Sequence, residues 1–319
     1  MILLDIIWFN LLPLLVLIGA GWFLESRFRV GGETYGILIS RAVLPCFIFY
    51  NLYRYMEAEY ICLLPAAAVL FLLLFGISRA VSSPAGIDGK ALCAASLFPD
   101  IGHIGAAVIL LVYTQPAFTG GPALPFEQEA IGAMLVLLVF TEFLTQTAGV
   151  SLLRKEEGFL KKSVLHLLHM PALYAVFLAW AVRSAGFSME QTFLWPVLVH
   201  FNGAFIILIA VCTGVQLRRH ASRAVFRPVW SAAAVRLLLS PLLALGILWV
   251  MPPVHPVLAQ VFFLCSAVPA SMTPFLRQEE RGENPAWTVQ AVLWNTFLGI
   301  FTLPAAVWAA YFLFPVTGG

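Results

Sequence analysis

The chain has 319 residues, of which 61% are hydrophobic and only 11% are charged, and its formal net charge is +2. A typical soluble domain is roughly 45–50% apolar and about 25% charged, so this composition excludes an ordinary soluble protein. The net charge is too small and its carriers too scattered for nucleic-acid binding. The five cysteines lie in apolar stretches without paired spacing, so we expect no disulfide framework, metal or cofactor.

The apolar residues form stretches of about 20 residues, the length that an α-helix needs to cross a hydrocarbon core of about 30 Å. Because these runs are continuous and do not alternate, they predict helices and not barrel strands. We therefore expect an all-α integral membrane protein embedded in a lipid bilayer. Its transmembrane helices, about ten in number, are predicted at 6–24, 34–53, 60–80, 90–114, 128–152, 164–183, 191–214, 228–250, 256–278 and 285–313.

Lysine and arginine are divided unequally between the joints that connect these spans. The odd-numbered joints hold most of the 18 lysines and arginines, whereas the even-numbered joints hold only Arg54 and Arg183. Cytoplasmic loops carry an excess of these residues. We therefore expect the odd-numbered joints in the cytoplasm and both termini outside it, in a multi-pass protein of the cell (inner) membrane.

The longest charged joint lies in the middle of the chain, which indicates two halves of five spans each. Because five is an odd number, the second half enters the membrane from the opposite side, and the halves form an inverted repeat. We expect the first repeat at 1–153, a cytoplasmic linker at 154–163 and the second repeat at 164–319.

The fourth predicted span contains residues that break a helix. Pro99, Gly102 and Gly105 lie within seven residues of one another, and proline removes a backbone donor while glycine weakens the helix. Asp100 lies about 15 Å from the cytoplasmic edge of this span, close to the bilayer centre. His103, beside the break, is expected either to relay protons or to pack between helices.

The ninth predicted span is interrupted at a comparable depth from the opposite face. Pro269 and Pro274 flank Ser271 and Thr273 there. Irregular backbone at mid-membrane is tolerated only where it is buried in protein or lines an aqueous cavity. Two opposed breaks direct the N-terminal ends of two half-helices at one point, which suits a carboxylate or similar anion. These residues are therefore predicted to bind the substrate, with simple proline kinks as the alternative.

Three further polar residues lie inside predicted spans. Glu142, deep in the fifth span, is expected to carry protons together with Asp100, and a structural glutamate is the alternative. Asn295 occupies a similar depth in the tenth span and is a candidate substrate ligand. Arg236, in the eighth span, is expected to snorkel to the cytoplasm or to pair with an acid such as Asp100 or Glu142. A counter-charge for an anionic substrate is the other role open to it.

With these breaks the chain resembles the auxin efflux carrier family, which includes plant PIN-type carriers and bacterial malonate or malate carriers. The first break is similar to the family motif Pro-Asn-x-x-x-x-Gly-x-Pro, and the second to Leu-Pro-x-x-x-x-Pro-Phe. The matching segments occur in order along nearly the whole chain: Leu44-Pro45, Pro99-Asp100 with Gly105, Met170-Pro171, Gly214 to Leu217, Arg236 to Pro241, Pro269 with Pro274-Phe275, and Asn284-Pro285.

The resemblance implies a scaffold from helices 1, 2, 6 and 7, and a transport core from helices 3–5 and 8–10. It also implies homodimers that carry organic anions by an elevator-like movement. The chain departs from the family at Asp100, where the family has asparagine, at Ala107, where it has proline, and at Met170, where it has asparagine. Because an ionised aspartate repels an anion, Asp100 implies either proton coupling or a less anionic substrate.

The resulting expectation is a secondary transporter for a small organic anion such as a carboxylate, with the proton as coupling ion. A sodium-coupled symporter or a cation/proton antiporter of the same inverted-repeat fold is the alternative. The chain has neither a His-Glu-x-x-His nor a Gly-x-Ser-x-Gly motif, so an enzyme is not expected.

Overall fold

A computed structural model gives the conformation of most of the chain. It describes residues 7–8, 12–30, 32–114, 124–149, 170–220, 227–272 and 286–316. The predicted linker at 154–163 and the candidate ligands Thr273 and Pro274 lie outside these described residues.

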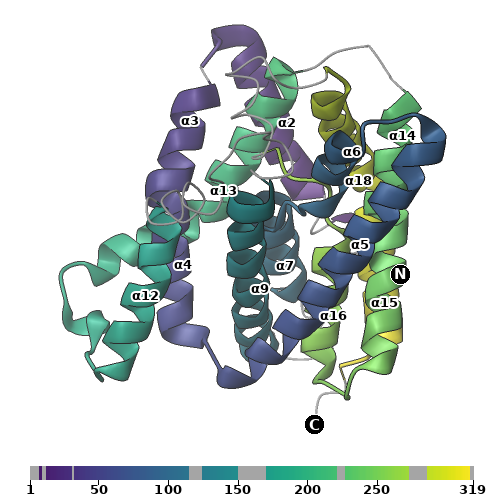
Figure 1. Cartoon of the computed structure of the whole chain (residues 1–319). Helices are drawn as coiled ribbons and strands as arrows, with labels where there is room; N and C mark the ends of the chain where they lie inside the picture. Colours follow the sequence, from purple (N-terminus) through teal and green to yellow (C-terminus); the bar gives the residue numbers. More distant parts are fainter. Residues whose placement is uncertain are drawn as a thin grey trace.

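The regular secondary structure of the described residues is helical, with short π-helical and 3-10-helical turns labelled η (Figure 1). The first half contains α2 (Leu12–Phe28), α3 (Gly32–Leu38), η2 (Ile39–Val43), α4 (Leu44–Tyr55), η3 (Ala58–Cys62), α5 (Leu63–Ala85), α6 (Gly89–Leu97), η4 (Ile101–Gly105), α7 (Ala106–Tyr113), α9 (Leu124–Leu144) and η5 (Thr145–Gly149). The second half contains α12 (Pro171–Ser184), η6 (Met189–Gln191), α13 (Trp195–Arg219), α14 (Arg227–Ala233), η7 (Ala234–Leu239), α15 (Ser240–Val250), α16 (Pro256–Ala267) and α18 (Ala286–Leu313). Each of the predicted spans overlaps at least one of these helices.

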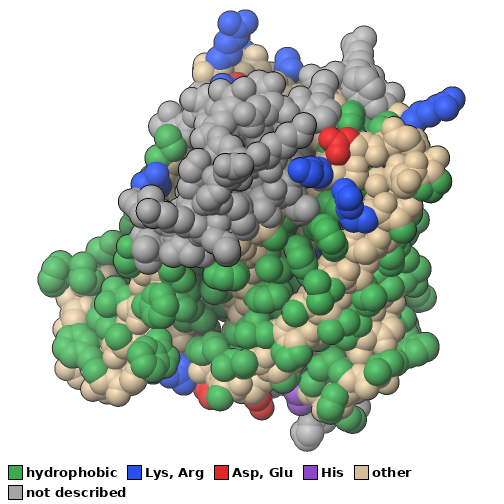
Figure 2. Space-filling model, in the orientation of Figure 1, with side chains coloured by type: hydrophobic (Ala, Val, Ile, Leu, Met, Phe, Trp, Pro, Cys, Tyr) green, Lys and Arg blue, Asp and Glu red, His purple; other side chains and the backbone are tan. Residues whose placement is uncertain are grey.

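Six helical stretches of the described chain are long and apolar enough to cross a membrane. They are Tyr35–Tyr55, Ala58–Ala85, Phe126–Gly149, Trp195–Arg219, Arg227–Val250 and Trp287–Leu313. Shorter apolar helices occupy Ile101–Tyr113, Pro171–Ser184 and Pro256–Ala267. On the face shown in Figure 2, charged side chains lie toward the two ends, and a broad hydrophobic region lies between them. This is the pattern of a multi-pass membrane protein.

Several helices continue beyond the ends predicted for them, and α5 and α13 extend furthest. The third predicted span stops at residue 80, but α5 continues to Ala85, and in this additional turn the Ser82 hydroxyl donates a hydrogen bond to the Arg79 carbonyl at 2.8 Å. α5 ends at Gly86, whose φ of 64° lies in the left-handed region typical of a helix C-cap. α13 likewise continues from the predicted end at 214 to Arg219.

α2 and α13 approach each other closely through two glycines. A Cβ atom on Gly214 would lie 1.9 Å from the carbonyl oxygen of Ile18, and one on Gly21 would lie 2.0 Å from that of Val211. Small residues allow such backbone contact between membrane helices. α13 also contacts α4, where the rings of Phe47 and Phe205 stack with centroids 3.7 Å apart. α4 in turn packs against α12.

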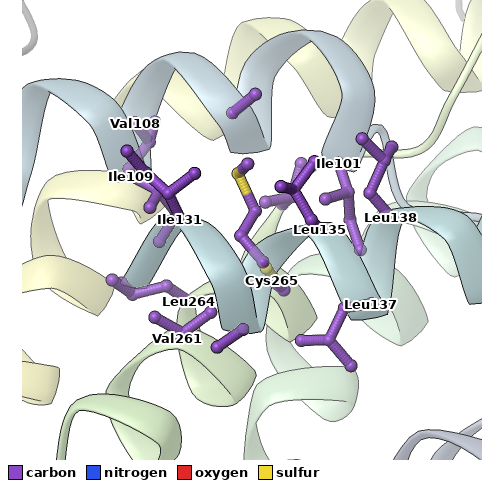
Figure 3. Packing of buried hydrophobic residues seen from close by; sticks show 14 of the residues in the cluster. Ile101, Val108, Ile109, Ile131, Leu135, Leu137, Leu138, Val261, Leu264 and Cys265 are labelled. Atoms are coloured by element: carbon purple, nitrogen blue, oxygen red, sulfur yellow. The ribbon is translucent and has the colours of Figure 1, made fainter. Parts of the chain in front are cut away.

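A second group of helices surrounds the centre of the molecule. α9 packs against both α7 and α16, and α16 also contacts α15 and α18. Figure 3 shows the apolar side chains that meet where α7, α9 and α16 come together, among them Ile109, Leu135 and Val261. All three of these side chains are buried. This packing surrounds two helix breaks, which lie side by side in space.

Candidate functional site

The predicted breaks in the fourth and ninth spans are present in the structure. α6 ends at Leu97 and α16 ends at Ala267. The next residues, Phe98 and Val268, both have extended backbone, with ψ of 104° and 141°. All four residues are buried, so their backbone polar groups need partners within the protein.

The two extended segments provide those partners for each other. Pro99 and Ala270 face each other in an antiparallel bridge. The Asp100 N–H donates to the carbonyl oxygen of Pro269 at 2.9 Å. The Ser271 N–H donates to the carbonyl oxygen of Phe98 at 2.8 Å. We call residues 98–100 and 268–271 the crossover. It joins chain segments that are about 170 residues apart in sequence.

The helix restarts immediately after the crossover. Asp100 is the N-cap residue of η4, and its carbonyl oxygen accepts the N–H of Gly105 at 2.9 Å. A Cβ on Gly105 would lie 3.3 Å from the Val268 side chain, and one on Gly102 would lie 3.3 Å from that of Leu138. The small residues therefore let this half-helix lie close to its neighbours. Its N-terminal end, which carries positive partial charge, lies at Asp100.

An acid–imidazole pair forms at this half-helix terminus. The Asp100 Oδ1 lies 2.8 Å from the His103 Nδ1, and both side chains are mostly shielded from solvent. Glu142 of α9 interacts electrostatically with His103, and Asp100 interacts electrostatically with Cys212 of α13. The structure therefore brings together the titratable residues that were predicted from separate spans, and it places Asp100 toward α13.

Arg236 has different partners from those predicted. Its side chain is 1% exposed. Its Nε donates to the carbonyl of Val268 at 2.8 Å, and its Nη2 donates to those of Ser266 at 2.7 Å and Cys265 at 3.3 Å. Snorkelling to the cytoplasm was therefore a wrong prediction, and these bonds go to backbone oxygens instead of to an acid. The reason is the break itself, because a helix C-terminus leaves carbonyl groups without intrahelical partners.

Ser240 contributes to the same arrangement. Its hydroxyl donates to the carbonyl oxygen of Ser266 at 2.8 Å, so that oxygen accepts bonds from two side chains of the eighth predicted span. A cation at a helix C-terminus also interacts favourably with the partial negative charge there. Arg236 and Ser240 thus stabilise the end of α16 where the crossover begins.

A small cavity lies between α5, α9 and α16 beside the crossover. Its volume is about 40 Å³, and most of its lining is apolar, with Thr141, Arg236 and Ser266 as its polar residues. Pockets that hold small-molecule ligands have volumes of about 300–1,000 Å³, so this cavity is far too small for an organic anion. In this conformation Arg236 is therefore separated from any site large enough for an organic anion on that side.

Asn295 of α18 lies on the other side of the crossover. It is fully buried, and neither its Oδ1 nor its Nδ2 has a hydrogen-bond partner in the described part of the chain. One turn further along, a Cβ on Gly299 would lie 2.6 Å from the Pro269 ring. One turn earlier, Ala291 packs in the same buried cluster as Ala270. Asn295 therefore belongs to the helix face that covers the second segment of the crossover.

Most of the predicted substrate ligands are thus brought together. Those at the crossover or in the half-helix that follows it are Pro99, Asp100, Gly102, His103, Gly105, Pro269 and Ser271. Sequence reasoning did not find Cys212 as a neighbour of Asp100, nor Ser240 as a partner of the break. The role of Ser240 could have been predicted, because a helix break leaves carbonyl groups that need hydrogen-bond donors from neighbouring side chains.

A family model described as "Membrane transport protein" matches residues 6–308. No curated protein matches the chain.

Proposed function

The chain belongs to the auxin efflux carrier family of membrane transport proteins, and from this premise we propose that it is a proton-coupled carrier of a small organic anion. Members of this family are transporters and not enzymes, and the chain is accordingly a multi-pass membrane transporter. The substrate class, the coupling ion and the movement are our proposal. The Asp100–His103 pair at the crossover is the observation that carries it.

The substrate site lies beside Asp100, on the side of the crossover that faces α13. The N-terminal end of the half-helix supplies positive partial charge there. An ionised aspartate about 4 Å from a carboxylate would cost about 4 kcal/mol at an effective dielectric constant of about 20, which weakens binding about 1,000-fold. A proton on the Asp100–His103 pair removes this repulsion. The anion therefore binds together with a proton and leaves when the proton leaves.

Glu142 extends this pair toward α9. Its electrostatic interaction with His103 supports a role in passing the proton to or from the site. Asn295 completes the site from α18, because it lies one turn before Gly299, which packs against Pro269, and its buried carboxamide has no hydrogen-bond partner in the described part of the chain. Thr273 and Pro274 are proposed as ligands from the sequence alone, and Arg236 acts as a counter-charge only if the small cavity beside it enlarges during the cycle.

Transport requires the site to face each side of the membrane in turn. We propose that helices 1, 2, 6 and 7 form the scaffold and that helices 3–5 and 8–10 form the moving core of two inverted repeats. The close contacts of α2 with α13 and of α4 with α12 support a separate scaffold. On this proposal the carrier is a homodimer of the cell membrane, with both termini outside the cytoplasm.

Sodium coupling is the second candidate. The observation in its favour is Asn295, whose Oδ1 lacks a hydrogen-bond partner in the described chain. Unwound backbone carbonyls of broken helices coordinate sodium in other transporter folds. A sodium ion at this carboxamide would replace the proton as the coupling ion.

Flux measurements in proteoliposomes test these proposals. We expect uptake of one class of mono- or dicarboxylate to increase with an inward proton gradient and to be independent of sodium. Asp100→Asn should bind the anion without a proton and lose the pH dependence. Asp88→Asn is the matched control, because Asp88 caps α6 through its side chain and asparagine caps equally well. If Asp100→Asn and Glu142→Gln both keep full pH-dependent uptake, the proton proposal is wrong.

A further inference from the structure

A second hollow lies at the end of the molecule where α4 and α12 terminate, away from the crossover. Its volume is about 300 Å³, at the lower end of the range for ligand pockets. The side chains of Tyr53, Arg54, Arg183 and Glu190 line it. We call it the α4–α12 pocket. The proposed transport cycle uses none of these four residues.

A sharp turn after α12 builds one wall of this pocket. Gly186 has a φ of 64°, and its N–H donates to the Arg183 carbonyl at 3.1 Å. The turn returns the chain to α4, where the Met189 N–H donates to the Tyr53 hydroxyl oxygen at 3.2 Å. The same hydroxyl donates to the Glu190 Oε2 at 2.8 Å. The carboxylate of Glu190 is therefore held at a fixed place in the pocket.

The two arginines are also held in place by the protein. Arg54 lies over the rings of Tyr50, Tyr55 and Trp195, at 5.5, 5.2 and 5.9 Å from their centroids. It uses only its Nη1 in a described hydrogen bond, to the Tyr50 hydroxyl at 2.7 Å. A guanidinium has five N–H donors, so several remain for a ligand. Cation–π contacts orient the group without using these donors.

Arg183 is held on the opposite wall. Its Nη2 pairs with the Glu57 Oε1 at 3.2 Å, and its Nη1 donates to the Tyr53 carbonyl at 3.3 Å. Glu190 lines the pocket together with the two arginines, while Glu57, which is not a lining residue, pairs with Arg183. A pocket lined by fixed charges of both signs favours a ligand that also carries both signs, because the Glu190 carboxylate repels a simple anion.

The surroundings of the pocket indicate where that ligand comes from. Large apolar side chains are exposed close by in sequence: Phe193 is 85% exposed, Trp180 is 72% exposed and Phe187 is 54% exposed. Aromatic side chains of this kind gather at the interface between membrane and water, which is the depth of the lipid headgroups. An apolar rim suits acyl chains, and the charged interior suits a headgroup.

We propose that the α4–α12 pocket binds the headgroup of a zwitterionic phospholipid that carries a primary ammonium group. The phosphate binds the free N–H donors of Arg54 and Arg183, which match phosphate oxygens in pairs. The ammonium donates to the carboxylate of Glu190. This lipid site is independent of the proposed substrate site, and the lipid stabilises the contact between α4 and the turn after α12.

Native mass spectrometry of the full chain in detergent tests this inference with defined lipids. Phosphatidylethanolamine should bind at least about tenfold more tightly than phosphatidylcholine, whose methylated ammonium cannot donate hydrogen bonds. Arg54→Gln and Glu190→Gln should each weaken phosphatidylethanolamine binding about tenfold. Arg218→Gln is the matched control, because Arg218 also lies over a ring, that of Trp22, but does not line the pocket.

Several results would overturn the proposal. Equal binding of phosphatidylethanolamine, phosphatidylcholine and the anionic phosphatidylglycerol would show that the pocket does not recognise an ammonium group. Free phosphoethanolamine binding as tightly as the lipid would assign the pocket to a soluble zwitterion. If a transported carboxylate displaced the lipid, the pocket would be a substrate vestibule. Unchanged lipid binding by Glu190→Gln, which is exposed and close in shape to the original, would also contradict it.

Discussion

Replacing Arg236 by glutamine separates two roles that a buried arginine can have in a carrier. The arginine donates three hydrogen bonds to carbonyl oxygens at the end of α16. In Arg236→Gln the carbonyl of Ser266 keeps its bond from Ser240, while those of Val268 and Cys265 lose theirs. An unsatisfied buried polar group costs about 1–3 kcal/mol, so the free energy of unfolding should fall by about 2–6 kcal/mol.

The matched variant is Ser240→Ala. It removes one bond to a carbonyl that Arg236 still satisfies, so the expected loss is only about 0.5–1.5 kcal/mol. Both values can be measured by titrating purified protein from mild detergent into dodecyl sulfate and following tryptophan fluorescence. Arg236→Lys should recover part of the stability, because lysine keeps the charge but not the planar set of donors.

The opposite result would identify a counter-charge. Suppose the free energy of unfolding of Arg236→Gln stayed within about 1 kcal/mol of that of the original protein, while the KM for an anionic substrate rose. The arginine would then contribute mainly its charge toward the substrate, and its three bonds to carbonyl oxygens would contribute little to stability. A loss of stability accompanied by an unchanged KM in the protein that remains folded would support the positioning role.

Two further variants test other parts of the structure. Gly214→Val should disrupt the packing of α2 on α13, because even a Cβ would lie 1.9 Å from the Ile18 carbonyl oxygen, whereas Gly203→Ala meets nothing within 4 Å and should express normally. The comparison is the yield of monodisperse protein in gel filtration, and equal yields would contradict the close helix contact. Asn295→Leu should raise the unfolding free energy by about 1–3 kcal/mol, because it removes one buried carboxamide group that has no hydrogen-bond partner in the described residues, yet it should abolish transport. Retained transport by a stabilised variant would exclude Asn295 from the site.

The sequence was most informative where a residue type has a direct local effect. Pro99 and Pro269 cannot donate a backbone hydrogen bond, so the breaks could be predicted without knowing any neighbour. The sequence could not predict that the two breaks pair with each other, because this antiparallel pairing depends on how distant helices pack. The same holds for Arg236. Its position deep inside a predicted span indicated that its charge needed partners, but the sequence did not indicate that backbone carbonyl groups would be those partners. Those groups exist only because α16 ends in the middle of the molecule.

The crossover also has a consequence for hydrogen exchange. The amides of Asp100 and Ser271 lie outside any helix, yet each is bonded to a carbonyl of the other segment. Opening either bond would leave a donor and an acceptor unpaired at a largely buried position, which is costly. These two amides should therefore exchange with deuterium slowly and at matching rates. On the proposed elevator-like movement, the crossover would then travel intact as a rigid unit, and the changes of shape during transport would occur in the contacts around it.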